Sequence, residues 1–516
     1  MEDSSRPDRA TTAELVGLAA ADWLLDGVAG ADRGPSDRVD VSLYHGRAGI
    51  LLALHEAAVH SGERRYSEAV ESGADALAGD LDAVAGSSLY FGLGGVAVAL
   101  HALGREDAAR EALRRVRSAS VDGRWSKMFE LFAGNAGIGL AALRVGDLDL
   151  AVDAVTPYLA AATPTVHGVN WAVRPTPPRS HHVAHGTLGI VLALASVGTA
   201  AGRPDLLDLA LRGAADVVGR DEAGPEGFLV PHSDPPHRPD LVERYSLGWC
   251  NGPAGDAQVF RLLHQVTGDD AWRAIGDRSW HTVTASGLPA RLRPGFWDNN
   301  GRCCGTAGVL ALALDREVEQ GEDPAFTDVL VEDLLARAVV DASGARWSNH
   351  EHRATPSELE PRPGWAMGNA GILRELLRYA RVRTGRPDAY ATPWPDHPPT
   401  RRAAVSWAAS PPGDGGMHHG PMARKRGLRF LARDGRELTV RDAEGEQHRA
   451  TIEKVEKGEA FGAHEDGAFA FGYCKSCDWT GPARRARDKA RKDALEHQEE
   501  CPGKGKIRIG VTEDDD

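Results

Sequence analysis

One short motif recurs seven times along the 516-residue chain, and it constrains the fold more than any other feature. Each copy has a small or aromatic lead-in, then Gly-x-x-Gly, then an apolar run of roughly a dozen residues. A second helical stretch, such as YSEAVESGADALAGDL, lies between successive copies. The repeating unit is therefore a pair of helices. The first glycines of the seven copies are Gly46, Gly92, Gly134, Gly186, Gly252, Gly305 and Gly368.

The two helices of each pair differ in how their apolar residues are distributed. The runs that follow the glycines, such as GIVLALASV, are apolar nearly all round, which is typical of a buried helix. The intervening stretches are amphipathic and are expected to form an outer layer. The sequence therefore predicts an all-α fold, an α/α toroid of seven inner and seven outer helices. An open helical solenoid is the alternative, and the irregular steps of 42 to 66 residues between the glycines favour a closed ring.

Charge and hydropathy limit the partners and the location. No apolar run reaches the ~18 residues of a membrane helix, and the N-terminus is polar and charged, so we expect a cytoplasmic protein without a membrane partner. The net charge is −14, and the residues from Arg424 onward carry 20 basic and 20 acidic side chains. The first 423 residues are therefore acidic, which argues against nucleic acid as a partner because phosphate binding needs a basic face.

The six cysteines are too few for a disulfide framework and fall into two groups. Cys250, Cys303 and Cys304 stand just before the glycines of the fifth and sixth copies, and His185 stands just before those of the fourth. Equivalent positions face one another at one end of a ring. Three thiolates can then share one Zn²⁺ and leave a fourth position open, as catalytic zinc requires. Buried reduced cysteines are the alternative.

These motifs resemble those of the lanthionine synthetase C-like cyclases. The resemblance rests on the seven glycine repeats with AHG, WCNG and CCGTAG, and it covers about residues 10–390. It implies an α/α toroid with one zinc, here held by three cysteines instead of the usual Cys and Cys-His. It also implies a thioether-forming activity, the addition of a peptide cysteine thiol to dehydroalanine or dehydrobutyrine in lanthipeptide maturation.

Two alternatives remain within and beside this family. Some stand-alone relatives add glutathione or another small thiol to dehydrated side chains, and a non-catalytic toroid that binds a peptide and keeps zinc for stability is the second alternative. The sequence has no dehydratase-like segment. The expected partners are therefore a dehydrated precursor peptide and a separate dehydratase.

Attack of the thiolate on Cβ leaves an enolate whose Cα must be protonated, and histidine titrates in the right range. His185 occupies the position that resembles the family's histidine, and Glu130 stands where the family often has Asp. His185 can instead be a polar residue at a helix start, and Glu130 a helix-cap carboxylate. His181 and His182 remain alternatives for the proton donor.

Two nearby positions depart from the family pattern. Many cyclases have Arg where this chain has Ser246, with Arg244 two residues away, and an aromatic residue or His where it has Asn251. These differences leave zinc binding intact. They weaken the case for the usual proton-transfer arrangement and leave room for a different thiol or electrophile.

The C-terminal quarter reads as a separate module. We expect the toroid to span residues 1–389, a Pro/Gly-rich linker 390–423, and a small β-rich, C2HC zinc-finger-like module with an acidic tail 424–516. Four residues have the spacing of a closed, structural zinc site, which would be a second zinc; a small helical hairpin with stray cysteines is the alternative. The helix of this finger is basic, and basic fingers can bind nucleic acid, but a lone finger on an acidic body rarely suffices, so we expect it to dock a peptide or protein. The four predicted ligands are Cys474, Cys477, His497 and Cys501.

Overall fold

The computed structural model of the chain divides into two compact units, Met1–Ser410 and Pro411–Asp516. In the first unit the structure describes residues 8–30, 40–237, 242–290, 299–350 and 358–398. In the second it describes residues 437–441, 447–451, 470–474, 481, 493, 494, 496, 497, 501 and 507–512.

The helices that follow the glycines form the inner layer of the first unit. In every copy the first glycine is the N-cap of its helix, with extended backbone, and the apolar run forms the helix. Each inner helix contacts the next, and the last contacts the first, so the ring is closed. The inner helices are α2 (Arg47–Ser61), α4 (Leu93–Ala102), α6 (Asn135–Val145), α9 (Thr187–Ala200), α11 (Pro253–Thr267), α13 (Thr306–Gln320) and α15 (Asn369–Arg383).

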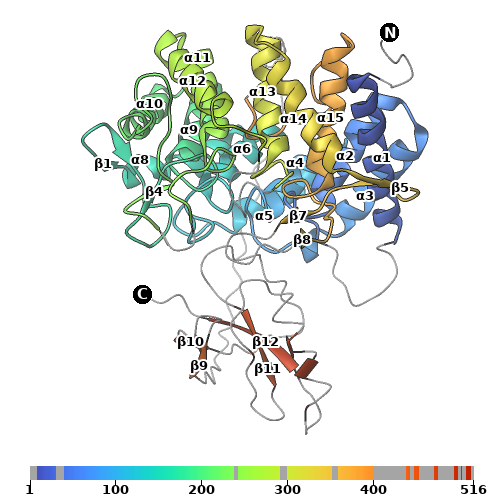
Figure 1. Cartoon of the computed structure of the whole chain (residues 1–516). Coiled ribbons are helices and arrows are strands. Elements are labelled where there is room, and N and C mark those ends of the chain that lie inside the picture. The colour runs from blue at the N-terminus through green and yellow to red at the C-terminus, as the bar shows by residue number, and fades with distance from the viewer. Residues whose placement is uncertain are drawn as a thin grey trace, which may run out of the picture. The chain divides into compact units, whose positions relative to one another are not determined.

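The intervening stretches form the outer layer, and each packs on an inner helix. The first helix, α1, packs on α15, and Figure 1 shows the two side by side although they lie near opposite ends of the amino-acid sequence of the first unit. The prediction of an α/α toroid of seven inner and seven outer helices is therefore confirmed in the described part of the chain. The outer helices are α1 (Arg9–Gly30), α3 (Arg64–Gly79), α5 (Glu106–Ser118), α7 (Leu148–Val155), α10 (Pro204–Val218), α12 (Asp270–Thr284) and α14 (Ala325–Arg337).

The second glycine of each motif allows the close approach that the ring needs. A Cβ at Gly371 would lie 2.1 Å from the carbonyl oxygen of Trp365 in its own repeat and 2.7 Å from Cβ of Arg302 in the preceding repeat. The other six second glycines meet a carbonyl oxygen at 1.9–2.4 Å in the same way. A side chain there would push the loop away from its helix, so the motif sets both the turn and the repeat-to-repeat spacing.

Short elements connect the helices. Two are helical, η1 (Leu81–Ala83) and α8 (Pro157–Ala161), and the strands form antiparallel pairs of two or three residues. The pairs are β1 (Thr163–Pro164) with β2 (Val169–Asn170), β3 (Arg179–Ser180) with β4 (Ser233–Asp234), β5 (Val339–Asp341) with β6 (Gly344–Arg346), and β7 (Asn349–His350) with β8 (Glu358–Leu359).

The start of the segment that we expected to be a linker is packed against the ring. Trp394, Asp396 and His397 are at most 8% exposed, and the backbone from residue 388 to residue 398 contacts side chains of the inner helices. We call residues 388–398 the central loop. Residues 399–423 of the expected linker lie outside the described residues.

The second unit contains a four-stranded antiparallel sheet in the order β11-β12-β10-β9. The hairpin of β9 (Glu437–Arg441) and β10 (Gln447–Thr451) agrees with the β-rich character expected of this module. Strand β12 (Ile507–Thr512) was not expected; it pairs with both β10 and β11 (Ala470–Cys474) and lies inside the sheet.

Candidate functional site

A belt of backbone hydrogen bonds runs around the ring at the start of the inner helices. It joins the residues that stand two positions before each first glycine, and the N–H of one residue donates to the carbonyl oxygen of the next at 2.8–3.2 Å. Six of the seven pairs are joined in this way in the described structure. Equivalent residues of neighbouring repeats are therefore held side by side. The belt residues are Tyr44, Tyr90, Phe132, Ala184, Cys250, Cys303 and Ala366.

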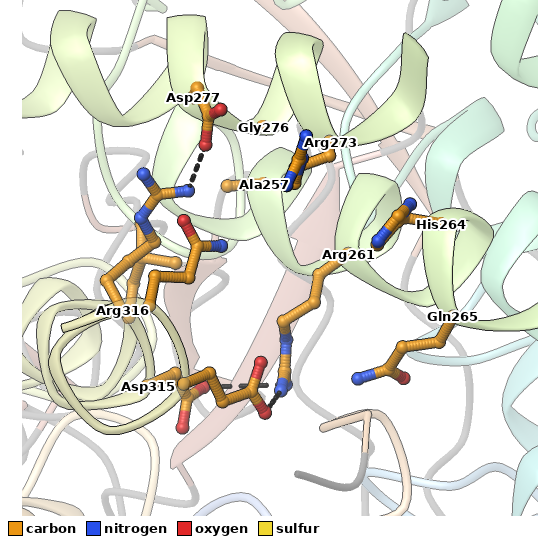
Figure 2. A pocket seen from close by; sticks show the side chains of 12 residues that line it. Ala257, Arg261, His264, Gln265, Arg273, Gly276, Asp277, Asp315 and Arg316 are labelled. Carbon is orange, nitrogen blue, oxygen red and sulfur yellow. Dashed lines mark hydrogen bonds and ion pairs between the residues drawn. The ribbon is translucent and has the colours of Figure 1, made fainter. Parts of the chain in front are cut away.

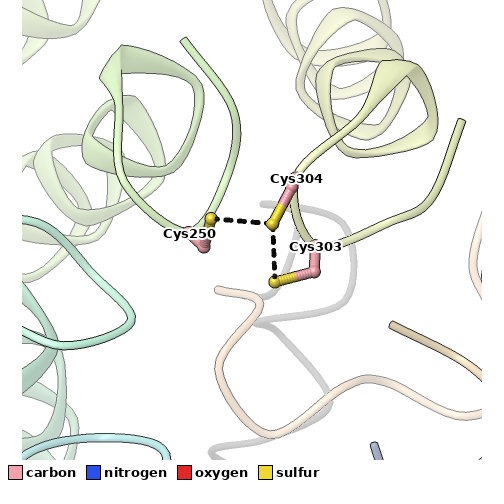
Figure 3. A group of neighbouring side chains, drawn as sticks. All are labelled: Cys250, Cys303 and Cys304. Atoms are coloured by element: carbon pink, nitrogen blue, oxygen red, sulfur yellow. Dashed lines mark hydrogen bonds between the residues drawn. The ribbon is translucent and has the colours of Figure 1, made fainter. Parts of the chain in front are cut away.

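The belt brings the three ring cysteines together. Cys250 and Cys303 are neighbouring belt residues, joined by the bond from Cys250 N to Cys303 O at 3.2 Å, and Cys304 follows directly. The Sγ atom of Cys304 lies 3.3 Å from that of Cys250 and 3.6 Å from that of Cys303, as Figure 3 shows. Cys250 and Cys303 are each 2% exposed, and Cys304 is partly exposed.

The three thiols fit a metal ion that prefers sulfur. Ligands at a Zn–S distance of about 2.3 Å in a tetrahedron are about 3.8 Å apart, close to the separations seen here. Burial raises the pKa of the Cys303 thiol, and hydrogen bonding to Cys250 raises that of Cys304. Such thiols favour the neutral form on their own, and a bound cation would reverse that preference. Cys250, Cys303 and Cys304 are therefore a possible metal-binding group.

The belt is interrupted between the third and fourth repeats, and Glu130 and His185 meet there. The N–H of Phe132 donates to Glu130 Oε2 at 2.7 Å in place of a bond to Ala184, and Ala133 N donates to Glu130 Oε1 at 2.7 Å. The same Oε2 lies 3.3 Å from Nδ1 of His185. Glu130 thus accepts two hydrogen bonds within the turn before α6, whose N-cap Gly134 receives no side-chain cap, and it also faces His185.

His185 is next to the thiol group along the belt. Ala184, which precedes it, donates from N to Cys250 O at 2.9 Å. The side chain of His185 is 21% exposed, and its ring makes an edge contact with Phe132. His185 and Cys304 occupy the same position in their repeats, directly before the first glycine.

The other two candidate histidines are buried away from solvent. His182 Nδ1 lies 2.8 Å from Asp256 Oδ2, and burial raises the pKa of that carboxyl group. Burial lowers the pKa of His181 to about 3, so its ring stays neutral. A residue that exchanges protons with a substrate has to be reachable, and of these three histidines His185 is the most exposed.

Sequence reasoning missed one side chain that contacts the thiols and one histidine at an equivalent position of the ring. The Tyr44 hydroxyl donates to Cys303 Sγ at 3.5 Å, and only the belt places these residues together, since 259 positions separate them. His45 has the same position in the first repeat as His185 has in the fourth, and burial lowers its pKa to about 4. The YHG motif was a visible signal for His45.

The positions that depart from the family pattern are also resolved. Asn251 Nδ2 donates to Cys250 Sγ at 3.5 Å, and Ser246 is 2% exposed. Arg244 pairs with Glu222 and Tyr245 at the surface, so its guanidinium does not take the place of the missing arginine.

The second cysteine group lies in the second unit. Cys474, at the end of β11, His497 and Cys501 have ligand atoms within 4.8 Å of one another, and the Cys474 and Cys501 Sγ atoms are 3.6 Å apart. The fourth predicted ligand, Cys477, lies outside the described residues. The three described side chains form a second possible metal-binding group.

A cavity of about 280 Å³ opens between α11, α12 and α13, away from the thiols. Charged side chains of its lining pair with one another: Arg261 pairs with Glu319 at 2.6 Å, and Arg316 pairs with Asp277 at 2.6 Å, as Figure 2 shows. These pairs leave little charge to attract a ligand.

Comparison with known proteins agrees with the ring. The profile of the family described as lanthionine synthetase C-like protein matches residues 37–235 and 237–331, more than half of the chain. Among solved structures, nisin cyclase superposes with a TM-score of 0.54 at 13% identity, over 72% of this chain and 96% of that one.

Two glycoside-degrading enzymes have lower scores. A GH76 alpha-mannanase from Bacteroides thetaiotaomicron gives a TM-score of 0.42 at 10% identity over 74% of this chain and 97% of that one. An unsaturated glucuronyl hydrolase specific for heparin gives 0.41 at 12% identity over 72% and 98%.

The search of curated proteins found no match to the chain. In a separate test of the helices, none of those described is long and apolar enough to cross a membrane.

Three observations agree on the family: the family profile, the closed ring with its glycine motifs, and the position of the three cysteines. The chain belongs to the lanthionine synthetase C-like family.

Proposed function

We propose that the chain is a zinc-dependent cyclase that adds a cysteine thiol of a dehydrated peptide to a dehydroalanine or dehydrobutyrine. One observation carries the proposal: three thiols suited to zinc are joined through the belt to a histidine that faces a carboxylate. In this proposal the substrate is a precursor peptide dehydrated by another protein.

Cys250, Cys303 and Cys304 would hold the zinc, with the fourth coordination position for the substrate. When bound, zinc supplies a thiolate at neutral pH from a substrate thiol whose ordinary pKa is ~8.5. Three sulfur ligands donate more charge than two sulfurs and an imidazole, so the substrate sulfur stays nucleophilic.

His185 and Glu130 would handle the proton. Addition of the thiolate to Cβ moves an electron pair to an enolate, and His185 would donate a proton to Cα. Glu130 is pinned by two backbone N–H groups, so its Oε2 can hold the His185 ring in one orientation. Glu130 acts through His185 and is a positioning residue.

A pair of variants tests this assignment. His185→Ala is expected to keep zinc and to slow thioether formation ~10²–10⁴-fold, the usual contribution of a placed proton donor. Glu130→Gln should slow it less. His101→Ala, in a partly exposed histidine at the end of α4, is the matched control and should change nothing. Formation of the ring product in a model peptide with one cysteine and one dehydroalanine is followed by mass spectrometry.

The same assay separates the alternatives. Full activity of His185→Ala would move the proton donor to another group or to water. Addition of glutathione to a dehydroalanine peptide without ring closure would favour the small-thiol enzyme. No acceleration with either thiol would favour the peptide-binding scaffold.

A further inference from the structure

The central loop enters and leaves the ring far from the belt. On its first arm Ala391 N donates to Glu56 Oε2 at 2.9 Å, and at its end Arg261 donates to the carbonyl oxygen of Pro398 at 2.7 Å. Glu56 and Arg261 stand ten and nine residues after the first glycines of α2 and α11. At 1.5 Å per residue they lie about 15 and about 14 Å along their helices from the belt.

The tip of the loop reaches the belt itself. Trp394 stacks on Trp365 with ring centroids 4.2 Å apart and donates from Nε1 to the Tyr90 hydroxyl at 3.2 Å. Trp365 directly precedes the belt residue Ala366, whose carbonyl oxygen accepts a hydrogen bond from Cys303 N at 2.8 Å. Trp394 therefore lies one layer of side chains from the cysteine group, inside the ring.

A second contact fixes the tip from the other side. The Tyr90 hydroxyl donates to the carboxylate of Asp396, which is 2% exposed, so Tyr90 is held between Trp394 and Asp396. His397 N donates to Trp394 O at 3.2 Å and closes the turn. His397 then pairs with Asp315 of α13 at 2.9 Å as the chain returns along the inner helices.

Arginines of three inner helices hold the loop by its backbone. Each donates to a carbonyl oxygen of the loop at 2.7–3.2 Å, so the contacts do not depend on the loop's own side chains. Removal of the loop would leave these largely buried cations without those acceptors, which is strongly unfavourable. The loop is therefore a permanent part of the ring. The arginines are Arg144 of α6, Arg261 of α11, and Arg374, Arg378 and Arg381 of α15.

We propose that the central loop is the floor of the thiol group: Trp394 seals the middle of the ring beside Cys303, and a peptide reaches the thiols from one face only, where Cys304 is partly exposed. A peptide then enters and leaves on the same side and is not threaded through the ring. The route of the peptide rests on the proposed function, whereas closure of the middle of the ring by Trp394 does not depend on catalysis.

Thiol labelling of the full-length chain tests the seal. After chelation of metal, the protein is treated with N-ethylmaleimide, and the rates at Cys303 and Cys304 are followed by peptide mass spectrometry. Trp394→Ala is expected to raise the Cys303-to-Cys304 rate ratio at least about tenfold, because water and reagent reach Cys303 through the opened floor. Trp394→Phe keeps an aromatic ring and should stay within about twofold of wild type.

A second tryptophan provides the matched control. Trp280 is 9% exposed and packs on Phe326 between the outer helices α12 and α14, so Trp280→Ala removes a buried ring of the same size away from the floor. It should leave the ratio unchanged. An unchanged ratio in folded Trp394→Ala, which includes an equal rise at Cys303 and Cys304, would overturn the proposal. Should Trp394→Ala not fold, Asp396→Asn is the second variant, because it weakens the hydrogen bond that holds Tyr90 against Trp394. An unchanged labelling ratio in Asp396→Asn would also overturn the proposal.

Failure of the proposed function gives a different result. If wild-type protein forms no thioether but Trp394→Ala raises the labelling ratio, the cyclase proposal is rejected and the proposed role of the central loop is supported. If wild-type protein forms the thioether but Trp394→Ala leaves the labelling ratio unchanged, the cyclase proposal is supported and the proposed role of the central loop is rejected.

Discussion

The two cysteine groups have similar ligand chemistry but depend differently on the fold around them. In the ring, Cys250 and Cys304 are 54 positions apart and are placed by the belt and by closely packed inner helices. In the second unit, Cys474 and Cys501 are 27 positions apart, in a unit of about a quarter of the length of the first. The ring brings its thiols together by packing within a large unit, whereas the second unit is much smaller.

This difference indicates whether the protein fold stabilises the metal site or the metal stabilises the fold. A site that is assembled by a large apolar core can lose its metal and keep its shape. A small unit buries a smaller fraction of its surface on folding, so a metal that draws its ligands together supplies a larger share of its folding free energy. We expect the folded ring to hold its ligands in place before a metal binds. We expect the second unit to fold only when a metal binds.

Metal removal is the largest expected effect. A strong chelator should release about two zinc ions per chain, one from each group, and should abolish hydrogen-exchange protection at Phe471 and Ala494. Protection at Val191 and Leu310, buried in α9 and α13, should remain. Hydrogen exchange with mass spectrometry measures both units in one sample. Protection that is lost in both units, or kept in both, would break the comparison.

Loss of one ring thiol should affect chemistry more than folding. Cys250→Ala is expected to remove one zinc and to bring thioether formation to the uncatalysed rate, while the ring loses only about 1–2 kcal/mol of stability from a small buried side chain. Cys474→Ala, the matched variant in the second unit, should remove the other zinc and unfold that unit. Metal analysis and thermal melting measure the two effects. A ring that unfolds in Cys250→Ala would make the two groups alike.

A smaller effect is expected from a change in packing beside the thiols. In Gly308→Ala the new Cβ would lie 2.4 Å from the carbonyl oxygen of Arg302, next to Cys303. Overpacking of this kind destabilises by about 1–3 kcal/mol and should also weaken zinc binding in the ring. Gly79→Ala, where nothing lies within 4 Å, is the control. Zinc affinity is measured by competition with a chromogenic chelator. Unchanged affinity in a destabilised ring would show that packing does not place the thiols.

The sequence predicts the ring well because its signals are local. The Gly-x-x-Gly motif marks the start of each inner helix, and in the structure every first glycine is an N-cap. The equivalence of the repeats then brings Cys250, Cys303 and Cys304 together without any knowledge of long-range contacts. The repeat also places His185 beside them.

The interruption of the belt and the position of the central loop depend on tertiary structure. Glu130 replaces a belt bond only because it folds back on Phe132, which no spacing reveals. The loop has the Pro-rich composition of a linker, and its burial depends on arginines of other segments. One signal was available: Arg374, Arg378 and Arg381 recur at helical spacing inside an otherwise buried helix, which indicates an acceptor that must come from elsewhere in the chain.

The contact between α1 and α15 determines when the ring can form. Helix α1 leaves the ribosome before α15, its packing partner, which follows more than 330 residues later. Until then the inner face of α1 and the open edges of the growing arc remain exposed, since contacts of such long sequence separation form slowly. Synthesis must pass Arg383 before the last seam closes. The thiol site lies close to that seam, because Cys303 N is bound to Ala366 O and Ala366 N to Tyr44 O, so the site is completed only when the two ends of the ring meet.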